Sequence, residues 1–149
     1  MITKHLQRCV PGLLLLLSGG SPAMATEEST QAVFQSIQTA WGRGDARSVL
    51  RHFGERKVSI SLPETDRAGG RFSRNQGYFI LKKHFEATQI LQFQFVETRH
   101  PSDAQRLAAA LALRRYRERG DGRVIQDWVL VTLVSEEERW VVSEIKALP

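Results

Sequence analysis

The sequence contains almost no cysteine: Cys9 is the only one among 149 residues. A single cysteine cannot close a disulfide within the chain, and it excludes structural zinc sites built from several thiolates. We therefore expect a disulfide-free fold that is held together by packing alone.

Long hydrophobic runs are also absent. A membrane-spanning helix needs about 20 apolar residues, and the longest apolar stretch, Leu13–Leu17, is far shorter. This stretch follows the basic residues Lys4 and Arg8 and precedes Ala23-Met24-Ala25. A basic start, a short apolar segment and an A-x-A site together are typical of a secretory signal peptide.

We expect cleavage after Ala25. Residues 1–25 are then the signal peptide, and residues 26–149 form a single domain that is exported to the periplasm or beyond the cell. An uncleaved N-terminal anchor is the alternative. Cys9 would leave with the signal peptide, and it lies before the apolar segment, whereas the cysteine of a lipoprotein follows it.

Charge of one sign is only slightly in excess. Without Lys4 and Arg8 the formal net charge falls from +5 to +3, too weak a bias for a dedicated nucleic-acid-binding domain. The remaining histidines, His52, His84 and His100, have no metal-ligand spacing, so we expect no metal and solvated or locally hydrogen-bonded rings. There is no phosphate-binding loop and no G-x-S-x-G motif, so we expect no cofactor.

The first half of the chain is predicted to be mostly helical. Apolar residues recur at helical spacing over Glu27–Trp41, Gly42-Arg43-Gly44 ends this helix, and Asp45 caps a second, short one. Lys57–Leu62 alternates polar and apolar residues as a strand does, and the turn-rich residues up to Phe72 predict a hairpin. A capping box, Ser73 with Gln76, then starts another helix.

The second half is predicted to be sheet. Strands are expected around Leu91–Phe95, over Val124–Val134 and over Trp140–Ile145. Residues 102–117 are ambiguous, since a capping box and alanine-rich composition favour a helix. Their alternation and the Gly120-Asp121-Gly122 turn favour a strand instead, and we expect a strand.

Several short motifs, in this order and spacing, resemble the nuclear-transport-factor-2-like superfamily. Within it, the chain is most similar to the exported bacterial domain-of-unknown-function 4783 family. The motifs are Gly44-Asp45-Ala46, Val49-Leu50, Phe53, Val58-Ser59-Ile60-Ser61-Leu62-Pro63, Phe72-Ser73 and Trp140-Val141-Val142-Ser143-Glu144-Ile145. The resemblance implies an α+β cone: N-terminal helices packed on the concave face of a strongly curved antiparallel sheet, with a pocket at the wide end. It also implies that residues 102–117 are a strand. The resemblance does not indicate a function, because proteins with this fold have many different functions.

Two carboxylates are candidates for a general base. Asp127 interrupts an apolar strand, and on the concave face it would be partly desolvated, with a raised pKa. We favour the plainer interpretation that it lies near a strand end or faces solvent, in which case Asp127→Asn costs no more than about 1 to 2 kcal/mol. Glu144 is the second candidate, and a cross-strand ion pair is its more ordinary role.

Aromatic and basic residues are the candidate binding groups. A pocket wall would draw on Phe93, Phe95, Trp128, Trp140 and Tyr78, although a cone needs such residues for packing too. An anion such as phosphate or carboxylate would be held by the hairpin arginines Arg114, Arg115, Arg117, Arg119 and Arg123, for which a solvated hairpin tip is the alternative.

These observations favour an exported, non-enzymatic binding or interaction domain. Its partner would be a small molecule or a protein, or an anionic envelope surface if the arginines share one face; a homodimer is compatible with the sequence. The alternative is a cofactor-independent isomerase, dehydratase or hydrolase that uses Asp127 or Glu144. An enzyme needs an ionisable group in an open pocket with a second polar group opposite it.

Overall fold

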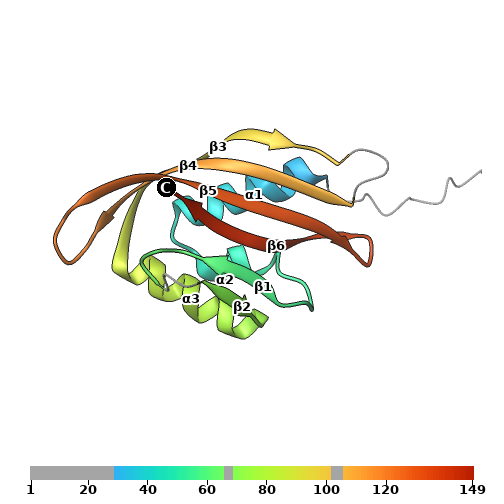
Figure 1. Ribbon diagram of the computed structural model, residues 1–149, viewed down its shortest axis with the longest axis horizontal. Coiled ribbons are helices and arrows are strands. Elements are labelled where there is room, and N and C mark those ends of the chain that lie inside the picture. The colour runs from blue at the N-terminus through green and yellow to red at the C-terminus, as the bar shows by residue number, and fades with distance from the viewer. Residues whose placement is uncertain (1–28, 66–68, 102–105) are drawn as a thin grey trace, which may run out of the picture.

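The computed structural model describes residues 29–65, 69–101 and 106–149, so the expected signal peptide lies outside the described residues. Three helices and six strands make up this part of the chain (Figure 1). Their order along the chain is α1 (Thr30–Gly42), α2 (Ala46–Leu50), β1 (Val58–Ser61), β2 (Gly70–Phe72), α3 (Arg74–Ala87), β3 (Thr88–Arg99), β4 (Leu107–Glu118), β5 (Val124–Glu136) and β6 (Arg139–Leu148).

Each helix begins where a side chain caps its free backbone N–H groups. Ser29 accepts from Ala32 N–H at the start of α1, and Asp45 accepts from Ser48 N–H at the start of α2. The predicted capping box of α3 is confirmed, since Ser73 and Gln76 bond each other's backbone N–H groups. No helix in the described residues is long and apolar enough to cross a membrane.

The strands form one sheet in the order β2-β1-β6-β5-β4-β3. All neighbouring pairs are antiparallel except β1 and β6, which run parallel, so the sheet is mixed at that one step. The ambiguous segment is a strand from Leu107 onward, as expected, while residues 102–105 lie outside the described part. The helices gather on one side of the curved sheet, and its long strands bend over them (Figure 1).

The interior of the cone is filled by side chains. Trp41 of α1 is fully buried and stacks on Phe93 of β3 with ring centroids 4.7 Å apart. Phe85 of α3 packs against the edge of the same indole at 5.4 Å. Such close packing of large rings contributes about 1.5 to 3 kcal/mol for each fully buried side chain.

The concave face of β4 carries small residues. Ala108, Ala110 and Ala112 are at most 2% exposed, whereas Leu107 on the opposite face is 49% exposed. Small side chains under the helices leave room for the large aromatic ones, which is how a close-packed core balances its volumes. The next residues of this face after the alanines, Arg114 and Tyr116, are buried as well.

Candidate functional site

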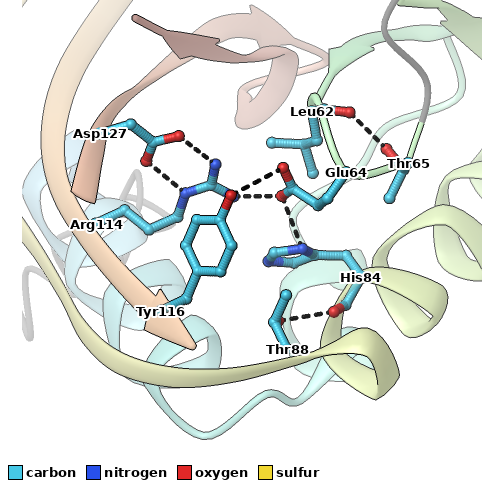
Figure 2. Close-up of polar contacts among 8 residues, drawn as sticks. All are labelled: Leu62, Glu64, Thr65, His84, Thr88, Arg114, Tyr116 and Asp127. Carbon is cyan, nitrogen blue, oxygen red and sulfur yellow. Dashed lines mark hydrogen bonds and ion pairs between the residues drawn. The ribbon is translucent and has the colours of Figure 1, made fainter. Parts of the chain in front are cut away.

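Arg114 is a fully buried arginine on the concave face of β4. Its place follows from strand alternation, because it continues the face that Ala110 and Ala112 begin. A buried guanidinium needs carboxylate partners and hydrogen bonds, since an isolated charge in the interior is strongly disfavoured. Two carboxylates from distant parts of the chain meet this need (Figure 2).

Asp127 is the first partner. It lies opposite Arg114 on β5, and its carboxylate accepts two parallel hydrogen bonds from Nε and Nη2 of Arg114, at 2.8 and 2.5 Å. This is the bidentate geometry in which arginine binds carboxylates most strongly. Asp127 is the fourth residue of β5 and so lies near a strand end, as the favoured interpretation allowed, but its side chain is only 11% exposed and does not face solvent.

Glu64 is the second partner. It lies just after β1 and Pro63, and its Oε1 accepts from Arg114 Nη1 at 2.6 Å. The same oxygen lies 2.8 Å from Nδ1 of His84 on α3. Glu64 therefore bonds a strand residue and a helix residue at once, and it joins the sheet to α3.

His84 and Tyr116 complete what we term the inner cluster: Glu64, His84, Arg114, Tyr116 and Asp127. The Tyr116 hydroxyl lies 3.5 Å from Glu64 Oε2, and the Arg114 guanidinium lies 4.5 Å above the Tyr116 ring, a cation–π distance. His84 is fully buried, which corrects the expectation of a solvated ring. Its Nε2 has no hydrogen-bond partner in the described part of the chain.

The inner cluster shifts the pKa values of Glu64, His84, Arg114 and Tyr116. Burial alone would raise the pKa of Glu64, but the hydrogen bond with His84 and the charge of Arg114 outweigh it and lower that pKa to about 2. Burial and the negative charge of Glu64 raise the pKa of Tyr116 to about 12. Burial lowers the pKa of His84 by more than its contacts with Glu64 raise it.

At neutral pH these shifts fix the protonation states. Glu64 is ionised, Tyr116 is a neutral phenol and His84 is a neutral imidazole whose Nδ1 lies 2.8 Å from Glu64 Oε1. For Arg114, burial opposes the charged form, but the hydrogen bonds with Asp127 and the charges of both carboxylates raise its pKa. Two carboxylates and one guanidinium leave the inner cluster with an excess of one negative charge.

Three members of the inner cluster, Glu64, Tyr116 and Asp127, line an open cavity of about 780 Å³, which we term the cone cavity. It lies between the end of α3, the loop after β1 and the ends of strands β4 to β6. Its lining residues are Pro63, Glu64, Ala87, Thr88, Tyr116, Glu118, Gly120, Arg123, Ile125, Gln126, Asp127, Ala147, Leu148 and Pro149. An open cavity with apolar walls and a few fixed polar groups is the usual form of a small-molecule site.

The cone cavity contains one of the two carboxylates expected from the sequence. Asp127 lines it, whereas Glu144 neighbours Thr132 and Ser59 in the sheet and points away from the buried Ile145 beside it. Glu144 forms no ion pair within the described residues. The same described residues contain no group of His, Cys, Asp and Glu that could hold a metal ion.

The five aromatic candidates are not brought together. Phe93 is buried against Trp41, and Phe95 meets the edge of Phe34 at 5.2 Å. Trp128 is 37% exposed on the outer face of β5, and Trp140 packs partly buried against the core. Tyr78 lines a different cavity, between the helices, and none of the five lines the cone cavity.

The five arginines also separate. Arg114 is inside the core, which corrects the expectation of a solvated tip for that residue, while Arg115 and Arg117 are exposed. Arg123 lines the cone cavity and pairs with Glu118 at 3.3 Å. Arg119 lines the cavity between the helices, so the five do not form one exposed basic face.

Sequence reasoning missed Glu64, His84 and Tyr116 as members of a site. Glu64 lies 50 positions from Arg114 and follows a strand-ending proline, so no local pattern marks it. A signal did exist for His84, because it shares the apolar face of α3 with Leu81 and Phe85, where a histidine must be buried. Tyr116 has the parity of the buried alanines of β4.

The comparisons with known proteins concern structure alone. No family model matches the sequence, and a search of curated proteins finds no match. A DUF4783 family protein from Bacteroides ovatus has a similar structure, with 13% identity, a TM-score of 0.60 and coverage of 75% of this chain and 90% of its own. A ketosteroid isomerase-like protein from Erwinia carotovora atroseptica is 15% identical, with a TM-score of 0.64 and coverage of 83% of this chain and 98% of its own.

A third similar structure is a protein of the NTF2-like family from Streptomyces avermitilis, named for a dehydratase activity. It is 15% identical, with a TM-score of 0.60 and coverage of 82% of this chain and 94% of its own. At these identities the similarity establishes the fold and no activity. The chain therefore has the nuclear-transport-factor-2-like cone fold that its motifs indicate.

Proposed function

We propose that this chain is an exported binding domain that holds a small molecule in the cone cavity and does not change it chemically. The observation that carries the proposal is an open cavity of about 780 Å³ beside a polar wall whose charged groups already bond one another. Arg114 already bonds Glu64 and Asp127, so the wall needs no ligand to hold its shape. Sites that are formed before binding lose little entropy when they bind.

The wall supports a ligand with a hydrogen-bond donor. The inner cluster carries one excess negative charge, and carboxylate oxygens accept more bonds than Arg114 alone supplies. Ile125, Ala147 and Leu148 line the same cavity and offer apolar contact. A small alcohol or primary amine with an apolar body satisfies both parts of this lining.

Binding is favoured over turnover because the carboxylates are poorly suited to take up a proton. A general base works best when its pKa is near the working pH, and the pKa of Glu64 is lowered to about 2. Both oxygens of Asp127 are engaged by Arg114. These carboxylates are therefore better acceptors of hydrogen bonds than of protons.

The test is a screen of alcohols and primary amines with apolar bodies, read out as a rise in melting temperature and followed by calorimetry. Ala87→Trp should abolish binding, because Ala87 is exposed at the rim and a tryptophan there fills the cavity without disturbing the core. Tyr116→Phe should weaken it, while the only other tyrosine, Tyr78, gives a matched control in Tyr78→Phe. Hits that bind Ala87→Trp as well as they bind the wild type would refute the proposal.

A cofactor-independent enzyme is the second candidate, and one observation favours it. Asp127 and Tyr116, an ionisable group and a second polar group, line the same open cavity. Solved structures with this fold include proteins named as ketosteroid isomerase-like and as a polyketide cyclase. Conversion of a bound hit to a new product, lost in Asp127→Asn with the fold intact, would replace the binding proposal with this one.

A further inference from the structure

A second cavity lies between α2 and α3, on the other side of the α3 C-terminus. We term it the helix groove; it measures about 610 Å³, and its lining includes Phe85 and Glu86, whereas the next residues, Ala87 and Thr88, line the cone cavity. The two cavities are thus separate sites. Nothing in the proposed function uses the helix groove.

Cations from three separate elements line the helix groove. Arg47 comes from α2, Lys82 from α3, and Arg119 from the connection between β4 and β5. Tyr78 lines it as well, and its hydroxyl raises the pKa of Arg47 by hydrogen bonding. Basic side chains that converge on one concavity from different elements are an arrangement suited to an anion with several oxygens.

The two acidic residues of the helix groove are already engaged. Both oxygens of Asp45 cap α2, bonding Ser48 N–H at 3.1 Å and the Ser48 hydroxyl at 2.6 Å. Glu86 lies 3.8 Å from Lys82, one turn earlier on α3. The local balance of three cations and two anions is therefore positive.

In the described part of the chain, the guanidinium groups of Arg47 and Arg119 have no carboxylate partner within 4.0 Å. Arg119 Nε donates to the Thr88 carbonyl oxygen at 3.2 Å, which orients the side chain and leaves its terminal nitrogens for a ligand. By contrast, Arg123 of the same hairpin is paired with Glu118.

We propose that the helix groove binds a phosphate monoester, with the phosphate between Arg47 and Arg119 and the organic part against Tyr78 and Phe85. A phosphate monoester carries nearly two charges and three terminal oxygens, which suits two guanidinium forks and a lysine better than a single carboxylate does. The aromatic lining gives the organic part an apolar surface. The ligand is a soluble small molecule, because the arginines line a concavity rather than an open face.

Phenyl phosphate is the probe, titrated into the ¹⁵N-labelled protein and followed by amide shifts. We expect saturable shifts at Gly44–Arg47 and at Tyr78–Glu86, and weaker binding of inorganic phosphate, benzoate and phenol, each of which has only part of the recognised chemistry. Arg47→Gln with Arg119→Gln should weaken binding by about tenfold or more, since two charge-assisted contacts are lost. Both residues are exposed, so we expect the variant to fold.

The matched control is Arg115→Gln with Arg117→Gln, which removes the same charge from exposed positions of β4. It should change phenyl phosphate affinity by less than about twofold, because screened charges at a distance contribute little. A second variant, Arg47→Lys with Arg119→Lys, keeps charge and packing but removes the forks, and it should bind more weakly than the wild type.

Any of three results would overturn the proposal. The first is that phenyl phosphate causes no saturable shift at the helix groove, the second that the control variant and the Arg47→Gln, Arg119→Gln variant bind it equally weakly, and the third that the lysine variant binds it as tightly as the wild type does. Vesicles of phosphatidylcholine with phosphatidic acid present the same phosphate chemistry on a membrane. Binding to these vesicles through Arg47 and Arg119 without binding of phenyl phosphate would also overturn it, in favour of a membrane surface as the partner.

Discussion

A buried arginine organises the interior of this molecule at the scale of single residues. Arg114 is fully buried, and its three side-chain hydrogen bonds within the described residues all go to carboxylates. Taking such charges out of water costs several kcal/mol for each ion, and only good geometry with more than one partner offsets that cost. The consequence is an asymmetry: the complete cluster is tolerated, but a cluster that has lost one carboxylate is not.

The first prediction concerns Asp127. We expect Asp127→Asn to lower the free energy of unfolding by about 2 to 3 kcal/mol, because the amide keeps the shape and one acceptor but leaves Arg114 with less compensation. This exceeds the cost of about 1 to 2 kcal/mol inferred from the sequence alone, where no partner for Asp127 was visible. Urea unfolding at neutral pH measures the difference.

Glu97→Gln is the matched control for this prediction. Glu97 is also paired with an arginine, Arg99, at 3.6 Å, but both side chains are mostly exposed. Exposed pairs contribute little, so the control should unfold with the wild-type midpoint. An Asp127→Asn variant that also keeps this midpoint would mean that Glu64 alone compensates Arg114.

The second prediction concerns acid stability. The pKa of Glu64 falls from 4.5 when unfolded to about 2 when folded, a difference that corresponds to about 3 kcal/mol of stability. Because the folded pKa is the lower one, this contribution is complete above pH 4.5 and is lost as the pH falls toward 2. The lowered pKa of His84 acts in the same direction below pH 6.5, since the unfolded chain takes up that proton more readily.

Glu64→Gln tests this assignment. The variant should be less stable than the wild type at pH 7, and its unfolding free energy should decline less between pH 4.5 and 2, because the titrating group is gone. Chemical denaturation at a series of pH values supplies both curves. Two parallel curves would show that other carboxylates cause the acid sensitivity.

At the scale of elements, α3 is set by a close approach to its neighbours. A Cβ on Gly77 would lie 2.6 Å from Cε2 of the buried Phe53 and 3.5 Å from Cδ1 of Ile60 on β1. The absence of a side chain at this position therefore lets α3 pack closely on the residues that lead into the sheet. The position of α3 in turn places His84 beside Glu64.

The third prediction follows from this contact. Gly77→Ala should destabilise the protein by about 1 kcal/mol. Overpacking costs about 1 to 3 kcal/mol, and the better helix propensity of alanine offsets only about 1 kcal/mol of it. Gly42→Ala, in the last turn of α1, is the matched control: nothing lies within 4 Å of its Cβ, so it should be neutral or slightly stabilising. Thermal melts of both variants measure the effects. An equal rise in melting temperature for Gly77→Ala and Gly42→Ala would disprove the close packing at Gly77.

The elements were predictable from the sequence because local chemistry decides them. The capping residues Ser29, Asp45 and Ser73 begin the three helices, and alternation marks the long strands. Residues 107–118 show the limit of local patterns, since helix propensity and alternation disagree there and pairing with both β3 and β5 decides for a strand.

The candidate site was predictable only in part. Asp127 could be recognised because a carboxylate in an apolar strand is unusual, but its partner Arg114 lies 13 positions away, and the other carboxylate on Arg114, Glu64, lies 50 positions from that arginine. Arg114 looked like one of several surface arginines, and only its parity with the buried alanines of β4 marks it as internal. Contacts between distant segments are set by tertiary packing, which no short sequence pattern encodes.

At the scale of the whole molecule, the filled interior, the cone cavity and the helix groove occupy separate parts of the fold. Trp41, Phe85 and Phe93 fill the cone, so the core stabilises the fold and leaves the cone cavity at its open end for a ligand. The end of α3 separates that cavity from the helix groove. The two proposals are therefore compatible: a hydrogen-bond donor ligand, an alcohol or a primary amine, in one cavity does not compete with an anion in the other.

The last prediction concerns the exported form. The signal-peptide pattern predicts that the mature chain starts at Thr26, and N-terminal sequencing of the exported product tests this; an intact Met1 in a membrane fraction would contradict it. Such a chain has no cysteine, since Cys9 is the only one, and every described helix and strand begins after Thr26. Its melting temperature should therefore be the same with and without a thiol reductant, because the packing of the core and the inner cluster stabilise it without any disulfide. A clear drop on reduction would mean that Cys9 is retained and pairs two chains.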